Sequence, residues 1–266
     1  MSDARSTRRR ARPVLAAPIV AIDVQRRELA LRKPLVTAQD TMTVRTVFLV
    51  TVRDADGVVG LGEAAPLVWA GTETEEQCLA ALESLRAGVL RGGDADAALH
   101  DCPAASAAWD LALHDLAACR LAVPLARLLG DSTVPDVAVN ALVADAAGAS
   151  AAVDQGFETL KVKVGRSLDA DVIRLRAIRE AVGPAPALRI DPNGAWVSVS
   201  QALRALEQLA PYALEYVEQP IAAGEIGTTA RALAEVRERS GVAVAPDESV
   251  TGVEEARLLL ATGAAD

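Results

Sequence analysis

The chain has 266 residues, a formal net charge of −9 at pH 7, and 51% hydrophobic residues, of which few are aromatic. This length suits one large domain or two ordinary ones. The acidic balance argues against nucleic acid or an anionic membrane as the main partner, and no segment is long and apolar enough to predict a transmembrane helix. The cysteines Cys78, Cys102 and Cys119 lack metal-ligand spacing, which favours reduced, packed thiols in a cytoplasmic protein.

The first half of the chain is predicted to hold a tail and then mixed α and β structure. Residues 1–18 begin with a basic run that has no periodic apolar pattern, and we expect them to be disordered. Alternating residues predict a strand at 19–31 and a hairpin at 45–64, whose Val-rich runs are joined by Asp-Ala-Asp-Gly. Helical periodicity follows at 73–90, which opens with acidic residues suited to a helix N-terminus, and at 105–121.

From residue 135 onward, predicted strands and helices alternate. The β-type runs recur at regular intervals, at 137–143, 159–165, 187–194, 214–220 and 242–249, with a helical segment after each one. This alternation indicates a parallel sheet built from βα units. The second half of the chain is therefore predicted to be α/β with about five strands.

Polar residues stand where these strands end. Asp191 ends one strand, with Asn193 two residues on; Glu218 ends the next, and Asp247 the one after, with Glu248 beside it. The carboxyl ends of parallel strands meet at one rim of a βα barrel, so the three acids are expected to converge. Crowded carboxylates need a cation to offset their repulsion, and oxygen ligands with open positions suit Mg²⁺ better than Zn²⁺.

Two lysines precede these acids along the chain. Side chains alternate faces along a strand, so Lys161 and Lys163 point the same way and are expected to face the cavity of the acids. A metal ion and a neighbouring ammonium would both lower the pKa of Lys163 toward that of a usable base.

Each signal also has an ordinary explanation. A Lys-x-Lys strand is most often a solvated edge, and an Asp before a proline, as at Asp191, is typical of a turn or a helix cap. Glu218 is equally typical of a loop, and Asp247–Ser249 of a capping cluster. The functional interpretation depends on the joint pattern, because four consecutive strands carry Lys, Asp, Glu and Asp at matched positions.

Four segments that hold these residues resemble the muconate-cycloisomerase-like subgroup of the enolase superfamily: KVKVG, RIDPNGAW, EYVEQP and APDES. The segment GLGEAAPL and residues 107–130 resemble the N-terminal capping domain of that family. The predicted fold class is thus α/β, with an α+β capping domain at 19–134 and an incomplete (β/α) TIM-type barrel of about five strands at 135–266.

The resemblance implies a role for each polar residue. Lys163 would be the general base and Lys161 its electrostatic companion. The implied Mg²⁺ ligands are Asp191, Glu218 and Asp247. Asn193 and Glu248 would be supporting polar groups.

The resemblance also implies the chemistry, which is Mg²⁺-dependent removal of a proton α to a carboxylate through an enediolate. Among the activities of the subgroup it favours o-succinylbenzoate synthase, a lyase of menaquinone biosynthesis. Dipeptide epimerase and N-acylamino acid racemase are the alternatives. The implied partner is a small-molecule carboxylate, and a homo-oligomer is left open.

Members of the family carry a further lysine on a sixth strand, about two dozen residues past the third ligand and so beyond Asp266. We therefore expect a C-terminally truncated version of a longer enzyme. The alternative to an enzyme is a non-catalytic remnant that binds metal. A βα barrel that uses the acids for phosphate-bound Mg²⁺ is disfavoured, because the sequence has no Gly-rich phosphate loop.

Overall fold

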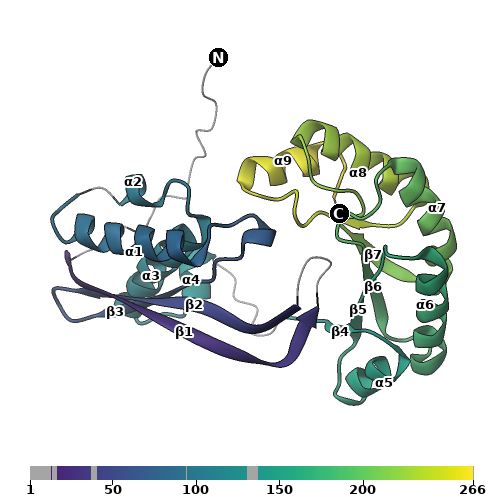
Figure 1. The fold of residues 1–266 in the computed structure, drawn as a ribbon, viewed down its shortest axis with the longest axis horizontal. Coiled ribbons are helices and arrows are strands. Elements are labelled where there is room, and N and C mark those ends of the chain that lie inside the picture. Colours follow the sequence, from purple (N-terminus) through teal and green to yellow (C-terminus); the bar gives the residue numbers. More distant parts are fainter. Residues whose placement is uncertain (1–12, 14–16, 37–40, 94, 131–136, 266) are drawn as a thin grey trace. The chain divides into compact units, whose positions relative to one another are not determined.

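The computed structural model describes residues 13, 17–36, 41–93, 95–130 and 137–265. The chain divides into two compact units, one whose described residues end at 130 and one that begins at 137 (Figure 1). Nearly all of the tail predicted at residues 1–18 lies outside the described residues. Within the described part of the chain, no helix has the length and apolar character needed to cross a membrane.

The first unit contains a three-stranded antiparallel sheet in the order β1 (Ile19–Val36), β2 (Thr41–Asp54), β3 (Val59–Ala64). The hairpin predicted at 45–64 is confirmed as β2 and β3. Its turn is held by Asp54, whose Oδ1 accepts the backbone N–H groups of Asp56 and Val58, while Gly57 takes a left-handed φ of 85°. The first strand runs further than predicted, because its pairing with β2 continues to Val36.

Helices cover one face of this sheet. Helix α3 (Pro103–Leu121) contacts β2 and β3, and α1 (Glu75–Val89) contacts β1. The unit also contains η1 (Val68–Ala70), α2 (Asp96–Leu99) and α4 (Leu125–Leu129). The first long helix begins at a capping box, in which Thr74 and Gln77 each bond the backbone N–H of the other. The buried core of the unit includes Phe48 of β2, Leu82 of α1 and Leu116 of α3.

Small residues let α3 lie directly on β3. A Cβ atom on Gly62 would lie 2.0 Å from the carbonyl oxygen of Ala108, and one on Gly60 would lie 2.2 Å from that of Ala112. Both distances are far below van der Waals contact, so only glycine fits at these two strand positions. This contact explains how a core with few aromatic residues is filled, since the two backbones themselves pack together.

We predict that Gly62→Ala lowers the free energy of unfolding by about 1–3 kcal/mol or more, because the new methyl group would overlap the α3 backbone. The matched control is Gly130→Ala, where an added Cβ meets nothing within 4 Å. Urea denaturation followed by circular dichroism would measure both variants. Equal stabilities of the two variants would contradict the close packing of α3 on β3.

The cysteines correct one expectation. All three are free, and Cys78 is buried as predicted, with burial as the largest cause of a raised thiol pKa. Cys119, in contrast, is exposed, because it lies on the outer side of α3. The prediction of packed thiols is therefore right for Cys78 and wrong for Cys119.

The second unit contains the predicted parallel sheet of five strands. Its order follows the chain: β4 (Ala141–Val143), β5 (Thr159–Lys163), β6 (Ala187–Asp191), β7 (Leu214–Glu218) and β8 (Val244–Ala245). The helical elements are α5 (Ala146–Asp154), α6 (Leu168–Val182), α7 (Val199–Leu209), η2 (Ala210–Tyr212), α8 (Ile226–Ser240) and α9 (Val253–Ala261). The first and last strands are shorter than predicted.

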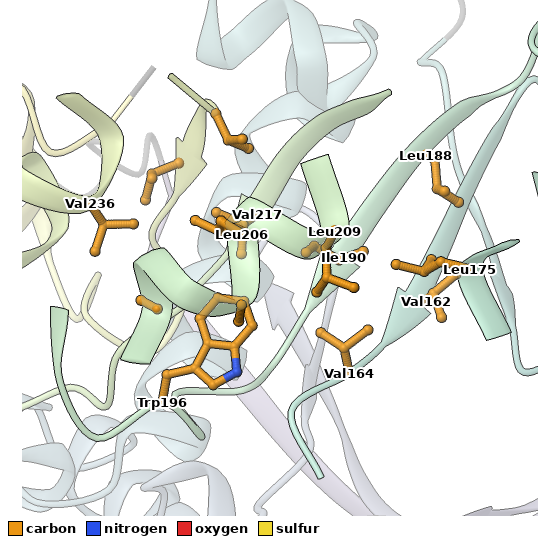
Figure 2. Close-up of a cluster of buried hydrophobic side chains, with 14 of the residues drawn as sticks. Val162, Val164, Leu175, Leu188, Ile190, Trp196, Leu206, Leu209, Val217 and Val236 are labelled. Atoms are coloured by element: carbon orange, nitrogen blue, oxygen red, sulfur yellow. The ribbon is translucent and has the colours of Figure 1, made fainter. Parts of the chain in front are cut away.

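The core of this unit lies between the sheet and the helices along its outer side (Figure 1). Figure 2 shows Val217 beside Leu206 and Ile190 beside Leu209, both leucines of α7, with Val162 of the next strand in the same cluster. All five side chains are buried. Because side chains alternate along a strand, the residues between these apolar positions must point to the opposite face.

Candidate active site

The face opposite the apolar core carries the predicted polar residues. Lys163 of β5 is paired in register with Asp191 of β6, so the ends of these two strands lie level. Glu218 ends the neighbouring strand β7. The parallel arrangement therefore brings a lysine and two acids from three successive strands to one edge of the sheet, as the spacing predicted.

Lys161 lies between the two acids. Its Nζ is 2.8 Å from Oδ2 of Asp191 and 2.5 Å from Oε1 of Glu218. The Lys161 side chain is only 17% exposed, and Asp191 is fully buried. A solvated strand edge does not have this geometry, so the alternative explanation of Lys161 as a surface lysine is wrong.

Lys163 is more open to solvent, with 47% of its side chain exposed. Its Nζ donates hydrogen bonds to Oδ2 of Asp191 and, at 2.8 Å, to Oδ1 of Asn193. The amide of Asn193 in turn donates to Oε1 of Glu248 at 3.2 Å. Six of the seven residues predicted for the site thus form one connected network, whose central member is Asp191.

Burial and the charges of neighbouring groups shift the pKa values of Asp191, Glu218 and Lys161. Burial raises the pKa of Asp191, but hydrogen bonds from Lys161, Lys163 and the Asn193 backbone outweigh it and hold that pKa below its usual value. Burial is the largest cause of a raised pKa at Glu218; the Lys161 hydrogen bond opposes it, and the Asp191 charge adds to it. Burial lowers the pKa of Lys161, yet its two carboxylate partners leave the pKa above its ordinary value.

Asp247 lies apart from this network. Its side chain is exposed, and its backbone N–H donates to Oε1 of Gln219 at 2.9 Å. The strand β8 before it is only two residues long, so Asp247 falls in the following turn rather than at a strand end. Within the described ranges, no group of three or more His, Cys, Asp and Glu side chains is arranged to hold a metal ion. The expected convergence therefore holds for two of the three acids.

The two acids that do converge fit a hard divalent cation. Asp191 and Glu218 direct one oxygen each at a common positive group, the Lys161 ammonium. Carboxylate oxygens are the ligands that Mg²⁺ prefers, usually one or two of them together with water and substrate. These two residues are thus chemically suited to hold the ion that the family resemblance implies.

The explanation of the acids as helix caps does not hold. Helix α7 is capped by Ser198, whose side chain accepts the Gln201 N–H, and α8 is capped by Glu225. Asp191 therefore does not cap α7, and residues 247–249 do not cap α9, whose N-cap is Gly252 without a side-chain cap. Asp191 does accept the N–H of Asn193 two residues on, which is a turn contact, but its other oxygen faces the lysines.

Two residues that support the site were not predicted. Asp171 of α6 is buried and accepts the Gly165 N–H at 2.7 Å, and it pairs with Arg174. Arg174 also donates to the carbonyl oxygen of Lys163 at 2.7 Å. Together they hold the chain where β5 ends. The only signal in the sequence is an Asp and an Arg three residues apart, a spacing common on solvated helix faces.

We predict that Lys161→Met lowers the free energy of unfolding by about 1.5–3 kcal/mol, because it leaves Asp191 and Glu218 without their shared charged donor. Urea denaturation in the absence of divalent metal would measure the loss. The matched variant Lys163→Met should cost less, since the Lys163 side chain is about half exposed and that of Lys161 is not. A Lys161→Met protein as stable as the original would show that this contact does not support the site.

The fold and the site define an α/β enzyme with acidic groups at the carboxyl ends of parallel strands. Family models match both units: residues 19–130 match the mandelate racemase / muconate lactonizing enzyme N-terminal domain, and residues 144–266 match the enolase C-terminal domain-like family. The chain belongs to the mandelate racemase / muconate lactonizing enzyme group of the enolase superfamily. The predicted family and fold class are thereby confirmed.

Known relatives indicate the range of activities. The L-Lys-D/L-Arg epimerase of Methylococcus capsulatus is 33% identical, with 93% of this chain and 72% of the relative covered. The dipeptide epimerase structure from Cytophaga hutchinsonii, complexed with Mg and D-Ala-L-Val, matches with a TM-score of 0.84 and 28% identity, over 94% of this chain and 70% of that one. The o-succinylbenzoate synthase of Thermobifida fusca is 43% identical over 126 residues, which are 46% of this chain and 38% of the relative.

These matches shift the balance between the predicted activities. Several epimerases and an N-succinyl-L-Arg/Lys racemase, all isomerases, match over nearly the whole chain, whereas the synthase match covers less than half of it. Membership of an enzyme family is supported, and the more specific prediction of a lyase is supported only in part. The short sequence motifs favoured the synthase, whereas the matches over nearly the whole chain favour the epimerases and racemases.

Proposed function

We propose that this chain removes the proton α to a carboxylate in a Mg²⁺-dependent reaction, and that it does so as an epimerase or racemase of a dipeptide or an N-acylated amino acid. The observation that carries the proposal is the Lys161 ammonium held between Asp191 and Glu218, with Lys163 beside them. The epimerase relatives that match nearly the whole chain support the substrate class.

Asp191 and Glu218, with Asp247 from the turn after β8, would hold the Mg²⁺ ion. The bound ion would supply positive charge for the substrate carboxylate as it gains negative charge. Lys161 adds a second positive charge at the same edge of the sheet. Both effects stabilise the transition state more than the ground state, because the negative charge grows as the proton leaves.

Lys163 is the proposed base. In its neutral form, Nζ takes the α-proton: the C–H bond breaks, an N–H bond forms, and the electron pair moves toward the substrate carboxylate. The contact of Nζ with Asn193, itself bonded to Glu248, orients the amine at the open side of the network. A proton returned by Lys163 restores the original configuration, so inversion needs a proton donor on the opposite face of the α-carbon.

The second candidate is o-succinylbenzoate synthase, which the 43% identity over 126 residues favours. A dehydration of that kind can use one lysine first as base and then as acid, and so needs only the lysines on β5. Both candidates share the proton removal and differ in the fate of the resulting carbanion. The proposed location remains cytoplasmic.

We predict that the chain, with Mg²⁺ in D₂O, exchanges the α-proton of the C-terminal residue of a suitable dipeptide for deuterium, as followed by proton NMR. Dipeptides ending in Lys, Arg, Glu or a hydrophobic residue form the test panel. Lys163→Ala should lower the exchange rate by about 100-fold or more, the usual effect of losing a general base. The exposed Arg204→Ala is the control and should leave the rate unchanged.

Three outcomes separate the candidates. Equal exchange in Lys163→Ala and the unaltered chain would remove the proposed base. A second assay would offer the chain the cyclohexadiene carboxylate that a synthase would dehydrate; loss of its ultraviolet absorbance, without exchange in any dipeptide, would favour the synthase. Saturable Mg²⁺ binding without either reaction would favour the metal-binding remnant.

We also predict that Asp191→Asn weakens Mg²⁺ binding by at least about 10-fold in isothermal titration calorimetry, since metal sites lose 10- to 100-fold even when an outer contact is removed. Asp169→Asn, an exposed acid in the first turn of α6, is the matched control with the same change of charge. Similar affinities of the two variants would exclude Asp191 as a ligand.

A further inference from the structure

Gln219, the residue after the predicted ligand Glu218, is fully buried although its side chain is polar. Its carboxamide uses all four of its hydrogen-bonding positions. Nε2 donates to the carbonyl oxygen of Ile221 and to Oγ of Ser249, each at 2.7 Å. Oε1 accepts the backbone N–H groups of Asp247 at 2.9 Å and of Ser249 at 3.2 Å. A buried amide satisfied in this way fixes whatever it binds.

The backbone of Gln219 makes two further links. Its N–H donates to the carbonyl oxygen of Ala245, at the end of β8, and its carbonyl accepts the Gly194 N–H at 2.7 Å, in the segment after β6. Its φ of 35° lies in the left-handed region, which costs a non-glycine residue of order 1–3 kcal/mol unless surrounding contacts hold it. One residue therefore joins the segments that come after β6, β7 and β8.

These links have a common consequence for the site. The segment after β6 carries Asn193, and the turn after β8 carries Asp247 and Glu248. The turn is anchored at Asp247 and Ser249 by the same oxygen, so residues 247–249 are fixed relative to the end of β7. Glu218 ends β7 and Asp247 lies in the turn after β8, and the Gln219 carboxamide bonds the backbone of that turn directly.

We propose that Gln219 is a positioning residue, whose carboxamide sets the place of the Asp247 turn and thereby the approach of Asp247 to Asp191 and Glu218. The effect of Gln219 on Mg²⁺ binding rests on the proposed function. The positioning of the turn by Gln219 does not depend on that function. Both the donor and the acceptor ends of the amide are needed. A methionine of similar length supplies neither, and it would leave the N–H groups of Asp247 and Ser249 without their partner.

The positioning can be tested without metal, by hydrogen–deuterium exchange resolved to single amides. In Gln219→Met, the Asp247 and Ser249 amides should exchange at least about 10-fold faster, since each loses an acceptor worth roughly 1.4 kcal/mol or more. The core amides of β5 and β6 should keep their rates. Ser249→Ala, a milder variant that removes one of the four bonds, should give a smaller change in the same direction.

The consequence for the metal is tested by a double-mutant cycle in Mg²⁺ calorimetry. Gln219→Met should weaken binding by about 10-fold in the unaltered chain and by less than about twofold when Asp247 is already replaced by Asn, because the amide acts through Asp247. Gln155→Met, at an exposed glutamine, is the control and should change neither affinity nor exchange.

Each result decides the inference. Unchanged exchange at Asp247 and Ser249 in both variants overturns the positioning role, and so does faster exchange that spreads through β5 and β6, which marks a general loss of stability. If Gln219→Met lowers Mg²⁺ affinity equally with Asp247 present and with Asp247 replaced by Asn, Gln219 does not act through Asp247. A chain that binds no Mg²⁺ counts against the proposed function, while the exchange results still decide the inference.

Discussion

The arrangement of this site depends on one contact, the Lys161 ammonium held between the carboxylates of Asp191 and Glu218. Two acids on neighbouring strands at the same level repel each other, and burying Asp191 completely adds a desolvation cost. A positive charge between them offsets both. The same contact aims two carboxylate oxygens at one point, which is what a divalent cation requires.

The fold supplies this contact through strand alternation. Val162, Ile190 and Val217 pack against the helices, and this packing forces Lys161, Asp191 and Glu218 onto the other face. Asp171 and Arg174 hold the end of β5 from outside, and Gln219 joins the segments after the next three strands. The apolar core thus determines which side chains point to the site face of the sheet. Buried hydrogen bonds then fix the positions of the segments that carry the site residues.

The residues that obey a regular spacing could be predicted from the sequence. Alternation in β5 and regular spacing to Asp191 and Glu218 placed these residues correctly, because both are fixed by backbone geometry. Asp247 could not be placed this way, since Pro246 ends a two-residue strand and the turn beyond it has no period. The contacts of Gln219 join three segments far apart in the chain, and no local pattern indicates them. The choice between epimerase and synthase was also beyond the motifs, which in the proposed mechanism serve a step common to both.

The most direct measurement is a crystal structure of this chain soaked with Mn²⁺ as a substitute for Mg²⁺, with the anomalous signal locating the metal. The account predicts a peak bounded by the carboxylates of Asp191 and Glu218, with the Lys161 ammonium displaced from between them. A peak elsewhere on the chain, with Lys161 still bridging the two acids, would contradict it.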